Sequence, residues 1–110
     1  MFLISQKIND MAGNEKIQLL HPAGKNAPRI SMDTYMLISD AIVKVLQQHR
    51  PMSFADMARE VRHYVTTNSP DFTGSIEWFT VSVKQHLEAE GIIETVVEKG
   101  RKMHRLTQSA

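Results

Sequence analysis

The sequence predicts a small α+β fold, mostly helical with one β-hairpin, and three observations carry the prediction. Three segments between residues 33 and 90 repeat apolar residues at helical spacing. Gly91 follows the last of these segments, and the β-branched run "IIETVV" comes directly after it. A basic turn around Gly100 then separates this run from "MHRLT". We therefore expect three helices followed by a hairpin, with an arm containing a short strand before them.

The N-terminal arm, residues 1–32, has a weaker pattern. In "KIQLL", Ile17 and Leu19 alternate with polar residues, which favours a short strand. The segment "HPAGKNAPR" holds two prolines and a glycine, which excludes a helix. Because "MAGNEKIQ" is typical of a protein start, we expect the first ten residues to be an upstream extension, with Met1 and Met11 as the two candidate starts.

The first two helices of the main domain, residues 33–110, have recognisable ends. Ser31 or Asp33 can cap the first helix, and Pro51 ends it. Ser53 and Asp56 approximate a capping box at the start of the second. The expected buried faces are Ile38, Ala41, Ile42, Val45 and His49 in the first helix, and Phe54, Met57, Ala58, Val61 and Val65 in the second.

The third helix is expected to run from about Gly74 to Glu90. Gly91 ends it as a residue with left-handed backbone angles. The expected buried stripe consists of Ile76, Phe79, Val83 and Leu87. The interpretation depends on this stripe facing the core and on a hairpin that begins right after Gly91.

Three helices followed by a hairpin is the order of the winged helix-turn-helix domain. The spacing in "VKQHLEAEGIIE" is similar to the end of the recognition helix and the start of the wing in MarR- and PadR-like bacterial regulators. "SFADMAREV" resembles the second helix of that motif. "HPAGK" and the pair Trp78–Phe79 also resemble a bacterial family of small uncharacterised winged-helix proteins. The resemblance implies a winged-helix domain over residues 33–110 and, for a regulator, dimers that bind paired half-sites on DNA.

If the domain binds duplex DNA, the third helix enters the major groove and the wing contacts phosphates. On the helix, the candidate base readers are Thr80, Lys84 and Gln85, since glutamine pairs well with adenine and lysine neutralises phosphate. On the wing, the candidate phosphate contacts are Lys99, Arg101, Lys102 and Arg105. These residues predict a small DNA-binding protein of the transcription-regulator type. The alternative for the wing is a solvated hairpin end whose charges discourage edge pairing.

A protein-interaction module is the alternative function. Glu77 and Glu88 share the outer face of the third helix with Lys84 and would be repelled by phosphate. Trp78 and Val81 leave apolar surface on the same face, which is typical of an interface with a second copy of the chain or another protein. The alternative for Trp78 is packing back onto the wing or the N-terminal strand.

Composition and motifs favour neither a membrane protein nor an enzyme. The chain of 110 residues is 42% hydrophobic, as expected of one globular domain, and it has no cysteine. No apolar run approaches the roughly 18 residues of a membrane span. The five histidines form no metal-ligand pattern, and neither a phosphate-binding loop nor a nucleophile motif occurs. We expect a cytoplasmic protein without catalytic activity, cofactor or metal.

Overall fold

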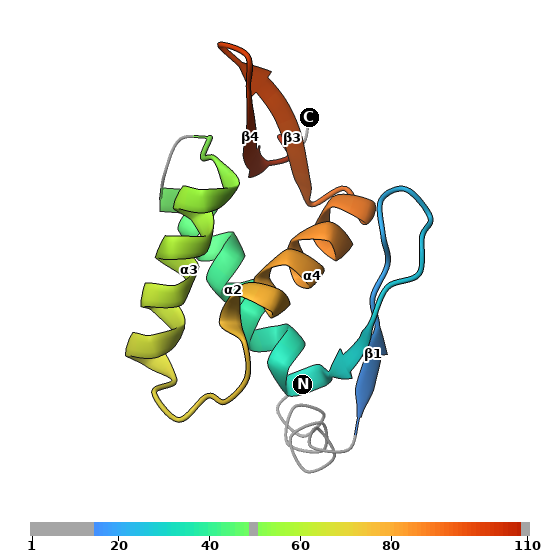
Figure 1. The fold of residues 1–110 in the computed structure, drawn as a ribbon, viewed down its shortest axis with the longest axis vertical. Helices are drawn as coiled ribbons and strands as arrows, with labels where there is room; N and C mark the ends of the chain where they lie inside the picture. Colours follow the sequence, from blue (N-terminus) through green and yellow to red (C-terminus); the bar gives the residue numbers. More distant parts are fainter. Residues whose placement is uncertain (1–14, 49–50, 109–110) are drawn as a thin grey trace.

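The structure, a computed structural model, describes residues 15–48 and 51–108. It is an α+β fold of three helices and two antiparallel hairpins, as Figure 1 shows. In chain order the elements are β1 (Lys16–Gln18), β2 (Arg29–Ser31), α2 (Met32–Gln48), α3 (Phe54–Asn68), α4 (Ile76–Ala89), β3 (Ile93–Glu98) and β4 (Arg101–Leu106). The predicted succession of three helices and a hairpin is confirmed.

Side-chain caps begin all three helices. The Ser31 hydroxyl accepts a hydrogen bond from the backbone N–H of Thr34, 3.1 Å away, at the start of α2. Ser53 caps α3 through the N–H of Asp56, as the capping pattern predicts. Ser75 caps α4 through the N–H of Trp78, so this helix begins two residues later than we expected. These caps satisfy backbone donors that the first helical turn leaves without partners.

The three helices enclose one hydrophobic core, with α3 and α4 both packed against α2 (Figure 1). Most of the predicted apolar stripes face it, but Phe79 of α4 and Phe54 and Ala58 of α3 are only half-buried. His49 and Arg50 lie outside the described residues. The core consists of Leu19, Ile30, Ile38, Ala41, Ile42, Val45, Leu46, Met52, Met57, Val61, Val65, Ile76, Val83, Leu87 and Ile93.

The arm is folded onto this core. The predicted short strand is confirmed as β1, but its partner β2, paired in the register Lys16↔Ser31, was not expected from the sequence. Leu19 is 1% exposed, so the loop after β1 contributes to the core. None of the helices in the described part of the chain is long and apolar enough to cross a membrane.

The predicted C-terminal hairpin is confirmed as β3–β4. Gly91 has φ 79° and ends α4 in the left-handed conformation, as expected. At the tip, Lys99 and Gly100 have φ 53° and 78°, the pattern of a type I′ turn that suits the twist of a hairpin. The bridge between Met52 and His104 joins β4 to the segment linking α2 and α3. The returning strand begins at Arg101, two residues before the predicted run.

Candidate nucleic-acid interface

The predicted base readers on α4 are not equally accessible. Thr80 is fully buried, and its hydroxyl donates to the carbonyl oxygen of Ile76 at 2.7 Å. The prediction that Thr80 contacts DNA is therefore wrong, because this side chain has no surface to offer a base. Gln85 is half-buried and remains on the surface side of the helix.

Lys84 is held within the protein rather than extended into solvent. Its side chain is 14% exposed, and Nζ lies 3.1 Å from Oε1 of Glu88 one turn later. Nζ also lies 5.8 Å from the centroid of the Phe54 ring, a cation–π distance. To neutralise a phosphate, Lys84 would have to leave both partners. Of the three predicted readers, Gln85 alone has no side-chain hydrogen bond among the described residues.

A chain of polar contacts continues from Lys84 into the base of the hairpin. The Thr95 hydroxyl donates to the second oxygen of Glu88. Because the hydroxyl has one hydrogen, His104 Nδ1–H must donate to Thr95 across 3.1 Å, which assigns the histidine tautomer. Burial lowers the pKa of His104, and the charge of Lys84 lowers it further, while Glu88 opposes them. These contacts hold the hairpin against α4. The charge of Lys84 is paired with Glu88 inside the fold.

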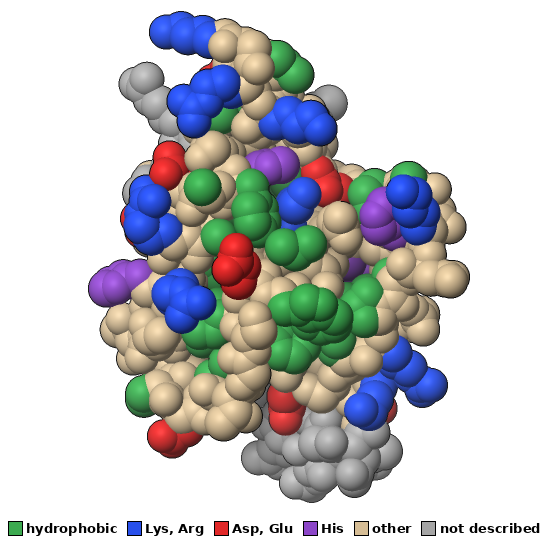
Figure 2. Space-filling view, in the orientation of Figure 1, with side chains coloured by type: hydrophobic (Ala, Val, Ile, Leu, Met, Phe, Trp, Pro, Cys, Tyr) green, Lys and Arg blue, Asp and Glu red, His purple; other side chains and the backbone are tan. Residues whose placement is uncertain are grey.

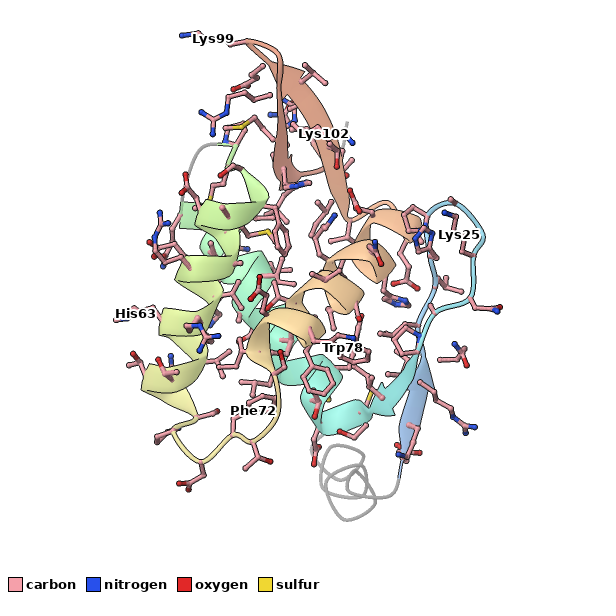
Figure 3. All side chains as sticks on the ribbon, viewed as in Figure 1. Lys25, His63, Phe72, Trp78, Lys99 and Lys102 are labelled. Atoms are coloured by element: carbon pink, nitrogen blue, oxygen red, sulfur yellow. The ribbon has the colours of Figure 1, made fainter. Side chains whose placement is uncertain are left out.

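The hairpin tip differs from α4. Lys99, Arg101 and Lys102 are exposed, and none of them forms an ion pair within residues 15–48 and 51–108. Arg105, the fourth predicted phosphate contact, is half-buried, and its Nε lies 2.6 Å from a carboxylate oxygen of Glu94 on the opposite strand. Figure 3 shows Lys99 extending from the tip.

His86 has a structural role that the sequence does not indicate. Its Nδ1 accepts a hydrogen bond from the backbone N–H of Leu20 at 2.9 Å. Its Nε2 lies 3.3 Å from Oε1 of Glu90, and the ring meets Tyr35 edge-on at 5.3 Å between centroids. His86 thus joins α4 to the arm, while Glu90, four residues later, holds its other ring nitrogen. No group of three or more potential metal ligands occurs in the described parts of the chain.

An aromatic cluster joins the first turn of α4 to the loop before it. Trp78 is 50% exposed, so about half of its side chain faces solvent. Its ring meets Phe79 edge-on at 5.1 Å, and Phe79 meets Phe72 at 5.8 Å. Val81 is half-buried. Figure 2 shows hydrophobic side chains gathered over this part of the molecule.

A groove of about 330 Å³ runs between α3 and the start of α4. Its lining is apolar at Phe54 and Ile76, with charged side chains from both helices. The lining residues are Phe54, Ala55, Ala58, Arg59, Arg62, Ile76 and Glu77. Arg59 and Arg62 were not predicted as site residues. The apolar spacing of α3 indicates which of its residues are buried, but not which other helix lies beside the exposed ones.

Comparison with known proteins gives a family without an assigned activity. A family model described as "Family of unknown function (DUF6958)" matches residues 16–103. The chain belongs to this family. No curated protein and no solved structure matches the chain. The matched range begins at β1 and ends within β4, so it includes β1, β2, α2, α3, α4, β3 and the first half of β4.

Proposed function

We propose that this DUF6958 member is a winged helix-turn-helix protein that binds duplex DNA, with β3–β4 as the wing. The order α2, α3, α4 and hairpin supports the assignment of the motif. The observation that carries the proposal is the cluster of Lys99, Arg101 and Lys102, exposed and without ion-pair partners among the described residues. Such side chains release counterions when they meet phosphates, which is the main source of sequence-independent affinity. We further propose that the protein regulates transcription through this DNA binding.

Fluorescence anisotropy with a random-sequence duplex tests the proposal. The wild-type chain is expected to bind with an affinity that falls steeply between about 50 and 200 mM salt. The triple substitution Lys99→Ala, Arg101→Ala and Lys102→Ala should reduce the salt slope by about three, one for each lost contact. A control with Lys16→Ala, Lys25→Ala and Lys44→Ala removes the same charge elsewhere and should retain more of the slope. Equal losses in both variants, or no binding by the wild type, would refute the proposal.

A protein interface is the second candidate function, and the exposed Trp78 favours it. Clusters of aromatic residues that remain half-exposed are typical of interface centres. Trp78 is the single tryptophan of the chain, so its fluorescence reports this surface alone. If a second copy covers it, emission should shift to the blue as protein concentration rises, together with a doubling of mass by light scattering. Constant emission and mass over the same range would exclude self-association through Trp78.

A further inference from the structure

We propose that the DNA backbone follows a strip formed by α3 and the β3–β4 hairpin, and that α4 is not the principal contact. This inference rests on the proposed DNA binding and names the surface that performs it. The strip consists of Arg59, Arg62, Lys99, Arg101 and Lys102.

The two arginines of α3 point toward one side of the helix. Arg59 and Arg62 are three residues apart, so they are neighbours on the helix surface. Both line the groove against Ile76 and Glu77, which places them on the edge of α3 nearest α4. Both side chains are exposed. Arginine is suited to phosphate because its planar fork donates two parallel hydrogen bonds.

The hairpin continues this edge. Strand β4 packs against α3. The pKa of the Asp56 carboxyl is lowered, chiefly by its 2.7 Å hydrogen bond from Arg59 and to a smaller extent by the charge of Arg101. The charges of Arg59 on α3 and Arg101 on the hairpin therefore both act on the same carboxylate. Figure 2 shows basic side chains on the hairpin and along the edge of the same face.

The charge balance favours this strip over α4. The strip holds five basic side chains, and the acids beside them are Asp56, Glu98 and, across the groove from the two arginines, Glu77. Helix α4 holds one lysine, which is already ion-paired, and the two glutamates Glu77 and Glu88. The pair of Arg59 with Asp56 is exposed, at 66% and 50% of the side chains, so it stabilises the fold little and can open to a phosphate. A polyanion meets less repulsion along α3 and the hairpin than along α4.

The test compares two double variants of the full chain on a random-sequence duplex of about one and a half helical turns. Arg59→Ala with Arg62→Ala removes two cations from the strip. Lys16→Ala with Lys25→Ala removes two from the arm, on the other side of α4 (Figures 1 and 3). If all five strip residues contact phosphates, wild-type affinity should fall roughly 500-fold between 50 and 200 mM salt, and that of the arginine variant roughly 40-fold. The arm variant should keep the wild-type fall.

Failure of the proposed strip and failure of the proposed DNA binding give different results. If the arginine variant behaves as the wild type while Gln85→Ala and Lys84→Ala abolish binding, α4 is the contact and the strip is refuted, although DNA binding stands. If the wild type shows no salt-dependent binding, both proposals fail. An equal reduction of salt dependence in both double variants also refutes the strip, since binding would then depend on total charge and not on the position of the arginines. Arg59→Gln with Arg62→Gln repeats the test with a longer side chain, and circular dichroism verifies that each variant is folded.

Discussion

The β3–β4 hairpin and helix α4 use their basic side chains in opposite ways. At the hairpin tip, Lys99, Arg101 and Lys102 extend into solvent. On α4, Lys84 is held by Glu88 and lies beside Phe54. The difference follows from position, because residues 99–102 at the tip are exposed, whereas α4 packs against α2, α3 and β3. A basic residue on a helix expected to read DNA can thus belong to the internal structure instead.

The largest expected effect concerns the burial of α4. Leu87→Ala should lower the free energy of unfolding by about 2–5 kcal/mol, because it leaves a cavity at a site that is 2% exposed. Val97→Ala on the hairpin, at a site 69% exposed, should change it by less than about 0.5 kcal/mol. Urea denaturation measures both. Similar losses in the two variants would contradict the view that α4 is the buried element and the hairpin the exposed one.

An intermediate effect is expected where the two regions meet. Thr95→Val removes the hydroxyl between Glu88 and His104, and leaves the buried Nδ1–H of His104 without an acceptor. We expect a loss of about 1–3 kcal/mol in unfolding free energy. Thr95→Ser keeps the hydroxyl and serves as the matched control. Because valine keeps the methyl group and lacks only the hydroxyl, a Thr95→Val variant as stable as the wild type would contradict a stabilising role for the polar contacts of Thr95.

The smallest expected effect is a dependence on pH. The folded-state pKa of His104 lies below its ordinary value of 6.5, so the unfolded chain binds a proton first as pH falls. The contribution of His104 to stability is complete above about pH 6.5 and is lost as pH falls through that value toward the folded pKa. His104→Asn should remove this part of the pH dependence. The measurement is the difference between wild-type and variant unfolding free energies at pH 7.5 and 5.5, and a constant difference would contradict it.

Much of the fold was predictable because its signals are local. Apolar spacing, Ser53 as a cap and Gly91 as a stop are each written within a few neighbouring residues. The partner of β1 was not predictable in this way. Strand β2 has only three residues and follows a proline-containing loop, so it has no clear pattern of its own. It pairs with β1 where both strands pack against α2.

The candidate site was less predictable than the fold. The burial of Thr80 had a signal in the sequence, since at about 100° per residue it lies only about 60° from Val83 and thus on the apolar side of the helix. His86 lies about 60° to the other side. Its partner, the backbone of Leu20, is 66 residues away, and no local pattern could indicate it. The ion pair of Lys84 with Glu88, at i, i+4 spacing, and the burial of both side chains were not predicted.

The bridge between Met52 and His104 anchors the hairpin at one point along β4, and the tip extends beyond that point. The two residues exchange both backbone hydrogen bonds, at 2.9 and 2.7 Å, near the middle of β4. Between this bridge and the tip, the hairpin is held by the pairing of β3 with β4, which ends at the pair Glu98–Arg101. A load on the tip would therefore be transmitted through this joint to the link between α2 and α3. This pair of peptide groups, together with the contact of Thr95 with Glu88, couples the outer end of the hairpin mechanically to the helices.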